Sequence, residues 1–219
     1  MGVSCICPTF GRVELLKEAV KCFVEQDYEG ESELLILNDA SWITLDCCYP
    51  NVFVENLSYR IKDMGSKWNV LTALASHDVL IPWPDDDLML PNAISAFVKL
   101  LGDKEYVHPK GRWTCSADGS NKNFTDKGAQ GIIAYTKDAW WEVGGYPEMY
   151  SGQDTAFMRR LRNKYGSIEP QLDEDTAFFV YRWRGVPGHL SGRKTVDKWD
   201  ALEDQMRRLT PPGVYSLEE

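Results

Sequence analysis

The sequence predicts an α/β fold with a mainly parallel central sheet flanked by helices, and with a smaller second half. In the first hundred residues, short apolar runs alternate with segments of helical periodicity, as in successive βαβ units. Polar residues follow several of the apolar runs abruptly, at the predicted strand ends where parallel sheets gather ligands. The 219 residues suffice for one fused domain with a substantial core.

Residues 1–102 are expected to form the half that carries the sheet. Apolar residues at helical spacing predict a helix that buries Val13, Leu16, Ala19, Val20 and Phe23. The predicted strands are Val3–Cys7, Leu34–Leu37, Val52–Val54 and Val79–Ile81. A second helix is expected over Ser66–Ser76 with Val70, Leu71 and Leu74 inward, and Pro91 is expected to open a third.

Residues 103–193 are less regular and are expected to form the acceptor and catalytic half. Gly111–Lys127 is rich in small and polar residues, which predicts a loop that could close over a ligand. The predicted strands are Gly131–Tyr135 and Ala177–Tyr181, and the predicted helices are a short one through Trp140–Trp141 and Asp154–Lys164. Residues 194–219 are expected to add a helix, Thr195–Leu209, and a tail.

The composition narrows the class of protein. A net charge of −9, from 33 acidic and 24 basic residues, disfavours nonspecific binding to nucleic acid or anionic lipid. No apolar run approaches the roughly 20 residues of a membrane span, and the N-terminus does not resemble a signal peptide. We therefore expect a cytoplasmic protein without a membrane span. The six cysteines lack zinc-site spacing and are interpreted as structural thiols.

Three adjacent carboxylates, Asp85, Asp86 and Asp87, follow the predicted strand Val79–Ile81. One interpretation is a solvated acidic turn before a helix. The other is a cation site, because hard oxygen donors suit Mg²⁺ or Mn²⁺ bound to phosphates. The apolar strand before the triplet favours the second interpretation, since it places the carboxylates at the ligand-binding edge of the sheet.

Asp154 and His189 are further candidates for chemistry. Asp154 opens an amphipathic helix and is either an N-terminal cap or a general base directed at an acceptor hydroxyl. His189 lies in a glycine-flanked turn and is better placed than His77 or His108 to bind a metal or a phosphate. A single histidine of this kind is also compatible with a structural role.

Several motifs occur in a recognisable order between Val3 and Ser191. They are Pro8-Thr9-Phe10-Gly11-Arg12, Gln26-Asp27-Tyr28, Asn38-Asp39-Ala40-Ser41, Gly65 with Asn69, Pro84-Asp85-Asp86-Asp87, and Gly144-Gly145-Tyr146 followed by Gln153-Asp154. In this order they resemble the nucleotide-sugar glycosyltransferases of the GT-A fold, most closely the inverting family 2. The departures from that family's pattern are Gly11, Asn38, Trp68, Pro84 and Gln153, which stand for Asn, Asp, Arg, Asp and Glu.

The resemblance implies a role for each matched residue. The expected contacts with the nucleotide-sugar donor are Pro8, Thr9, Arg12, Asp39, Lys67, Asn69, Asp85 and Asp86. Among them, Asp39 would contact the nucleotide base. The expected metal ligands are Asp86, Asp87 and His189, and Asp154 is the expected catalytic base.

The sequence thus predicts a metal-dependent inverting glycosyltransferase that moves a sugar from a nucleotide-diphosphate sugar to an acceptor hydroxyl. The expected cofactor is Mn²⁺ or Mg²⁺, and the expected donor is a UDP-sugar. A non-catalytic nucleotide- or sugar-binding module of the same fold stays open, as does a nucleotidyltransferase, although the first loop lacks the glycines of the latter. The acceptor stays open between a glycan, a protein, a small molecule and a modified nucleobase, and the oligomeric state is undetermined.

Overall fold

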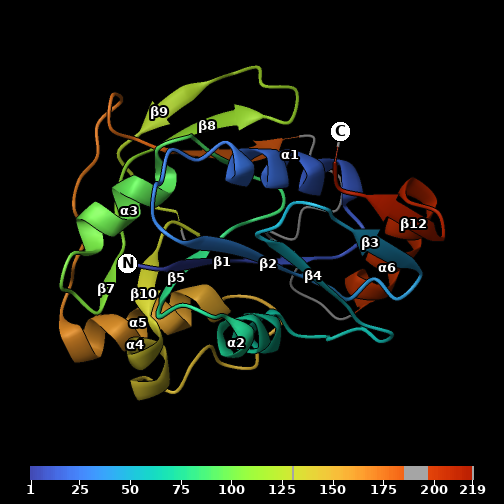
Figure 1. Ribbon diagram of the computed structural model, residues 1–219, viewed down its shortest axis with the longest axis horizontal. Helices are drawn as coiled ribbons and strands as arrows, with labels where there is room; N and C mark the ends of the chain where they lie inside the picture. Colours follow the sequence, from blue (N-terminus) through green and yellow to red (C-terminus); the bar gives the residue numbers. More distant parts are fainter. Residues whose placement is uncertain (130, 185–196, 219) are drawn as a thin grey trace.

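The computed structural model describes residues 1–129, 131–184 and 197–218 (Figure 1). Its central sheet has six strands, which are, in spatial order, β4 (Val52–Asn56), β2 (Ser32–Asn38), β1 (Val3–Thr9), β5 (Val79–Pro82), β10 (Ala134–Thr136) and β7 (Tyr106–Val107). The first four strands are parallel, and β10 pairs antiparallel with both β5 and β7. The predicted mainly parallel sheet is therefore confirmed.

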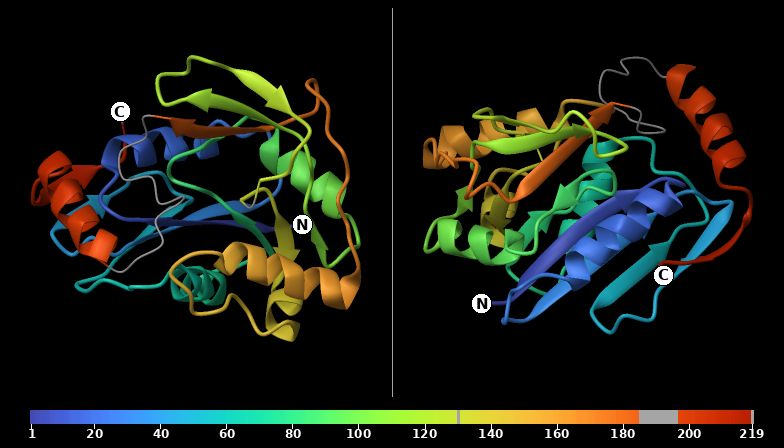
Figure 2. Two further views of the ribbon diagram at one scale, coloured as in Figure 1. Left: turned by 180° about the vertical axis from the view of Figure 1, so that it is seen from behind. Right: turned by 90° about the horizontal axis from the view of Figure 1, so that it is seen from above.

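Two smaller sheets accompany the central one. The four-stranded sheet has the order β6 (Leu88–Met89), β11 (Phe179–Arg184), β8 (Arg112–Ser116) and β9 (Asn123–Thr125). The two-stranded sheet pairs β3 (Ile43–Asp46) in parallel with β12 (Gly213–Ser216). The C-terminal tail is thereby fixed to the N-terminal half of the chain (Figure 2).

Helices cover both faces of the central sheet. One face carries α1 (Val13–Val24) and α3 (Ala93–Leu101), and the other carries α2 (Met64–Leu74), α4 (Lys137–Glu142) and α5 (Gln153–Tyr165) (Figure 1). A last helix, α6 (Asp197–Leu209), leads into β12. Two clusters of buried side chains follow from this arrangement, one on each face of the sheet. None of the helices in the described ranges is long and apolar enough to cross a bilayer.

The central position of β1 explains its apolar sequence. All seven of its residues are buried, because β2 and β5 pair with its two edges and helices lie on its two faces. Helix α1 buries the five residues whose spacing predicted it. Its Ala19 carbonyl also accepts a hydrogen bond from the indole of Trp83, 2.9 Å away, which fixes the chain just after β5. The start of the acidic triplet is thus held in place from within the core.

The predicted inward face of α2 is only partly right. Leu71 is buried, but Val70 and Leu74 are 37% and 55% exposed. The helix instead turns Gly65 and Lys67 inward. Hydrophobic periodicity does not register either residue as core, because one lacks a side chain and the other is charged.

The predicted loop over Gly111–Lys127 is also wrong, because β8 and β9 form an antiparallel hairpin there. Trp113 and Phe124 face each other across it, with ring centroids 5.6 Å apart. Strand β8 then pairs in parallel with β11. The polar composition of the segment predicts a loop, and it gives no sign of these cross-strand pairs, which lie on either side of the turn. The six cysteines are free thiols, and Cys5 and Cys7 are fully buried, as their interpretation as structural residues requires.

Gly65 provides a test of the packing between α2 and the segment after α4. A Cβ at this position would lie 1.9 Å from the carbonyl oxygen of Pro147. We expect Gly65→Ala to lower the free energy of unfolding by about 1–3 kcal/mol, because a backbone segment must move. Urea denaturation measures the change, with Ser66→Ala in the next helical position as the control. Equal midpoints for the two variants would contradict the close approach.

Candidate functional site

A cavity of about 440 Å³ lies at the carboxyl edge of the central sheet. Its walls come from the ends of β1 and β5, from α2, from β8 and β11, from Gly128, Ala129 and Gly131, and from the start of α5. Six of the residues predicted from sequence line it, namely Pro8, Arg12, Asp85, Asp86, Asp87 and Asp154. The structure therefore brings the acidic triplet and the predicted base, which are far apart in the sequence, to one cavity.

Arg12 joins the end of β1 to the acidic triplet. Its Nε lies 3.0 Å from Asp85 Oδ2, its Nη2 2.5 Å from Asp85 Oδ1, and its Nη1 2.6 Å from Asp86 Oδ2. Thr9 donates a further hydrogen bond of 2.7 Å to Asp85. This arrangement follows from the sheet, because β1 and β5 are adjacent parallel strands and end at the same edge. Asp85 is thus fixed by two predicted donor-contact residues.

Burial sets the electrostatics of the triplet. Desolvation raises the pKa of Asp85 to about 6, although the Arg12 guanidinium opposes the shift. Desolvation and the neighbouring charge of Asp86 raise the pKa of Asp87 well above its ordinary value. For Arg12, burial alone would lower the pKa, but Asp85 and Asp86 outweigh it and raise the pKa. These carboxylates therefore carry their charge at a cost that a bound cation would reduce.

Strand β11 supports the triplet from the other side. The backbone N–H of Arg182 donates to Asp87 Oδ1 at 2.8 Å, and the Arg182 Nε donates to the carbonyl of Asp86 at 2.8 Å. The same guanidinium forms an ion pair with Glu18 of α1. The Asp85 side chain is 3% exposed and is therefore enclosed, whereas the Asp86 side chain is 15% exposed and keeps some access to the cavity.

Asp154 lies in the first turn of α5, after Gly152, whose φ of 80° is a left-handed conformation that favours glycine. Burial raises the pKa of the Asp154 carboxyl, and the N–H of Thr155, which donates to it at 2.7 Å, acts in the opposite direction. A raised pKa makes the carboxylate a better proton acceptor. Its place on the cavity wall suits the predicted base.

Asp39 and Lys67 do not line the cavity but satisfy each other in the core beside it. Lys67 Nζ lies 2.6 Å from Asp39 Oδ1, and the N–H of Ile61 donates to Oδ2 at 2.9 Å. Burial raises the pKa of Asp39 and lowers that of Lys67, against the attraction between them. Each of these two residues therefore has the other as a structural partner, which the sequence did not reveal.

Asn69 is likewise not among the lining residues. Its amide donates to the carbonyl of Tyr146 at 2.8 Å and accepts from the N–H of Tyr146 at 2.8 Å and from the indole of Trp140 at 2.9 Å. These bonds hold the Gly144-Gly145-Tyr146 segment on α2. The contact of Asn69 with the site is therefore indirect, through the loop that carries Tyr146.

The residues present fit a divalent cation in part. His189, the predicted third ligand, lies outside the described residues, and within those residues no group of three or more His, Cys, Asp or Glu side chains is placed to hold a metal. Asp86 and Asp87 provide carboxylate oxygens at the cavity. Mg²⁺ and related ions are often held by one or two carboxylates together with water and phosphate oxygens. The pair therefore suits a cation that binds together with a diphosphate.

Sequence reasoning missed several lining residues. Arg112 falls within the predicted loop, yet its guanidinium donates to the carbonyls of Lys127 and Gly128 and lies over the ring of Tyr181, 5.4 Å from its centroid. The alternating Arg-Trp-Thr-Cys-Ser sequence of β8 was the available signal for a strand. Trp68 and Gln153, two of the departures from the family pattern, also line the cavity.

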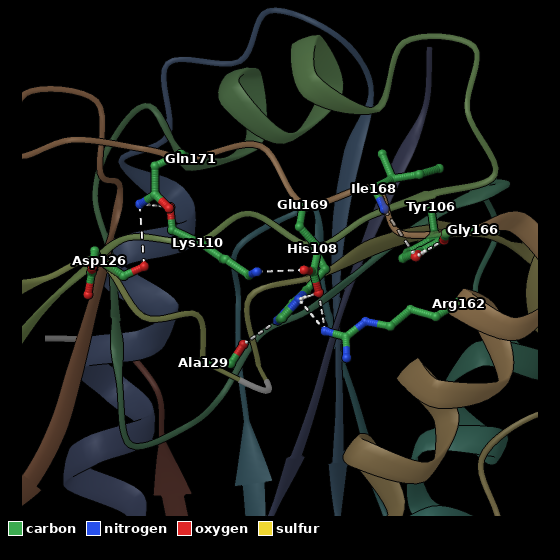
Figure 3. Close-up of polar contacts among 10 residues, drawn as sticks. All are labelled: Tyr106, His108, Lys110, Asp126, Ala129, Arg162, Gly166, Ile168, Glu169 and Gln171. Carbon is green, nitrogen blue, oxygen red and sulfur yellow. Dashed lines mark hydrogen bonds and ion pairs between the residues drawn. The ribbon is translucent and has the colours of Figure 1, made fainter.

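A partly buried ionic network supports the cavity wall at Ala129 (Figure 3). Glu169 accepts from Lys110 at 2.6 Å, lies 3.3 Å from His108 Nδ1 and pairs with Arg162 of α5. The other ring nitrogen of His108 lies 3.0 Å from the carbonyl of Ala129, which lines the cavity. Burial alone would raise the pKa of Glu169. Lys110, His108 and Arg162 stabilise the carboxylate more strongly, so its pKa is lowered to about 2.

Comparison with known proteins supports the fold. No family model matches the chain. The chain is 28% identical over 137 residues to the GalNAc(5)-diNAcBac-PP-undecaprenol beta-1,3-glucosyltransferase of Campylobacter jejuni. The aligned region covers 58% of this chain and 43% of that protein. The chain thus spans less than half of the length of this relative.

Two solved structures cover nearly all of the chain. TarS 1-349 of S. aureus in complex with UDP-GlcNAc has a TM-score of 0.69 and 15% identity over 96% of this chain and 65% of its own. The mannosyltransferase PcManGT of Pyrobaculum calidifontis, in complex with GDP-Man and Mn²⁺, has a TM-score of 0.61 and 15% identity. This match covers 94% of the present chain and 69% of PcManGT. At such identities the likeness establishes the fold alone, and the expected GT-A fold is confirmed.

Arg12→Met tests the ion pairs that hold the triplet. We expect a loss of about 3–5 kcal/mol in the free energy of unfolding, because two carboxylates lose their buried partner. The loss in the double variant Arg12→Met/Asp85→Asn should be smaller than the sum of the two single losses. Chemical denaturation measures both, and the exposed Arg159→Met is the control. Additive losses would show that Arg12 and Asp85 do not interact.

Glu169 should make stability depend on pH. Its pKa is about 2 in the folded protein against an ordinary value of 4.5, so its contribution is present above pH 4.5 and is lost as the pH falls toward 2. We expect the urea midpoint of the wild type to fall more steeply between pH 6 and pH 3 than that of Glu169→Gln. The exposed Glu174→Gln serves as the control. Parallel curves for wild type and Glu169→Gln would contradict this assignment.

Proposed function

We propose that the chain acts as an inverting glycosyltransferase that moves a sugar from a nucleotide-diphosphate sugar to an acceptor hydroxyl. The proposal rests on one observation: the acidic triplet and Asp154 line the same cavity at the carboxyl edge of the central sheet. It is supported by the relative from Campylobacter jejuni, which is named as a glucosyltransferase.

The proposed donor is a UDP-sugar. Structures of TarS contain UDP and UDP-GlcNAc, whereas that of PcManGT contains GDP-Man, so a sugar nucleotide is common to these proteins of the same fold. Pro8 and Arg12 would contact the donor from the end of β1, while Thr9 and Asp85 would position Arg12. Direct donor contacts of Asp39, Lys67 and Asn69 stay predictions, since these residues lie outside the cavity lining.

Asp86 and Asp87 would hold the divalent cation, Mn²⁺ or Mg²⁺, with His189 as the predicted third ligand. When bound, the cation supplies positive charge to the leaving diphosphate. Arg12 contributes by holding Asp85 and the Oδ2 oxygen of Asp86 in place. The other carboxylate oxygen of Asp86 would then bind the cation at the cavity wall. The presence of Mn²⁺ in the PcManGT complex supports this assignment by analogy of fold.

The proposed transfer step uses Asp154 as the base. The acceptor oxygen attacks the anomeric carbon and forms the new C–O bond, while its proton passes to the Asp154 carboxylate. The bond between the anomeric carbon and the phosphate oxygen breaks, and the nucleoside diphosphate leaves with the electron pair. A single displacement of this kind inverts the configuration. Gly152 immediately precedes α5, and Asp154 in the first turn of that helix lies on the wall of the cavity.

Asp154→Asn and Asp86→Asn should separate catalysis from binding. We expect Asp154→Asn to reduce transfer at least 100-fold while retaining Mn²⁺-dependent stabilisation by a UDP-sugar, because the amide cannot accept the proton. Asp86→Asn should lose that stabilisation, because a ligand of the cation is removed.

Nucleoside diphosphate release measures transfer, thermal denaturation with and without Mn²⁺ measures binding, and the exposed Asp103→Asn is the control. Donor binding without turnover in the wild type, under any acceptor, would instead identify a binding module. Undiminished transfer by Asp154→Asn would remove the assignment of the base.

A further inference from the structure

We infer that the acceptor is a neutral sugar ring with neighbouring hydroxyl groups, and that Trp68 and Gln153 select it. The inference rests on the proposed function, because it assumes that Asp154 takes a proton from the acceptor. It concerns the part of the cavity wall that surrounds Asp154, which α2, Tyr146 and the start of α5 provide.

Trp68 provides an apolar face to this part of the cavity. The side chain is half-buried on α2 and stacks on Tyr146, with ring centroids 6.0 Å apart and an interplanar angle of 26°. Tyr146 in turn stacks on Phe157 of α5 at 4.0 Å and 25°. Large aromatic side chains held in this way offer a rigid apolar surface at a low entropic cost. The C–H face of a pyranose ring is a neutral, flat surface that such a wall can accommodate.

Gln153 provides a polar group beside the base. It precedes Asp154 in α5, is 9% exposed and lines the same cavity. Its Oε1 is buried and has no hydrogen-bond partner within the described part of the chain. A buried carbonyl without a donor is costly, and a rotation of the amide can offer either its oxygen or its nitrogen to a ligand. A hydroxyl next to the one that faces Asp154 can make this bond.

The charges of the cavity disfavour an anionic acceptor. The cationic side chains among the lining residues that the structure describes are Arg12 and Arg112. Arg12 is bound to the acidic triplet, whereas Arg112 donates to the neutral carbonyls of Lys127 and Gly128, keeps its charge and has a buried Nε without a partner in the described part of the chain. The cavity is nevertheless acidic, because four carboxylates, those of Asp85, Asp86, Asp87 and Asp154, line it. Trp68 and Gln153 stand where the resembled family has Arg and Glu, so both changes make this wall neutral. A hydroxyl on a nucleic acid would bring phosphates into a cavity whose lining carboxylates outnumber its guanidinium groups.

A lone hydroxyl also fits this wall poorly. A serine or threonine side chain has neither a ring to cover Trp68 nor a second hydroxyl for Gln153. A sugar ring satisfies both groups together and leaves one hydroxyl for Asp154. The pairing of an aromatic face with an unsatisfied amide, one residue from the proposed base, therefore favours a glycan over a protein or a nucleic acid.

The first experiment compares acceptor classes. UDP-glucose, UDP-GlcNAc and GDP-mannose with Mn²⁺ serve as donors, and methyl β-D-glucopyranoside and methyl N-acetyl-β-D-glucosaminide serve as ring polyols. Cyclohexanol, a serine-containing peptide and a DNA oligonucleotide that contains 5-hydroxymethyluracil represent the other classes. We expect nucleoside diphosphate release to rise, and saturation-transfer NMR to detect binding, with a methyl glycoside only.

The second experiment identifies the selecting residues. Trp68→Ala and Gln153→Leu should each raise the KM for the methyl glycoside about tenfold or more, with a much smaller change in the KM for the donor. The matched controls are Trp141→Ala, a tryptophan that is 77% exposed, and Gln171→Leu, outside the cavity lining. Circular dichroism checks that every variant is folded. For Gln153, a partial rescue by Gln153→Asn or Gln153→Glu would distinguish hydrogen bonding from packing.

The outcomes separate this inference from the proposed function. Failure to bind or hydrolyse every donor would overturn the proposed function and the inference with it. Donor turnover combined with a preference for the peptide, the oligonucleotide or cyclohexanol would overturn the inference alone. A rise in donor KM rather than acceptor KM in Trp68→Ala would place Trp68 against the nucleotide, which would also overturn it.

Discussion

The site depends on the contact between Arg12 and the buried carboxylate of Asp85. Adjacent carboxylates in an enclosed place repel one another, and desolvation penalises each charge. Arg12 reduces this cost with bonds of 2.5–3.0 Å to Asp85 and Asp86, and Thr9 adds a hydrogen bond. Because β1 and β5 are adjacent and parallel, this contact is built from the two strand ends themselves. The rest of the cavity is arranged around that fixed corner.

A second constraint is that the cavity has two sides of different chemistry. The triplet and Arg12 make one side strongly polar, with Arg182 of β11 holding Asp87 from behind. Around Asp154 the wall is aromatic and neutral. A charged leaving group and a neutral acceptor are the reactants that such a division suits. The same division fits the proposed diphosphate-containing donor in a net acidic protein, since a local cation rather than the whole surface would provide the attraction.

The walls are held by contacts between segments that are distant in the sequence. Asn69 of α2 fixes the backbone of Tyr146, and the network around Glu169 joins α5 to the strand-end segment that contains His108. Through His108 the network reaches Ala129 on the cavity wall. Buried polar groups of this kind stabilise the fold only when their partners are all in place. The supporting residues therefore belong to the site as much as the lining residues do.

The sequence by itself determined the parallel sheet, the strand ends that carry Asp85–Asp87 and the helix that begins beside Asp154, because periodicity and apolar runs are local signals. Tertiary structure alone decided which polar residues satisfy one another. Lys67 pairs with Asp39 in the core, although its spacing on α2 reads as a charged surface position. Strand β8, which carries Arg112, gains its partners from β9 and β11, and no short window of sequence contains both. Contacts of this range depend on how the layers pack, which the order of residues along the chain does not reveal.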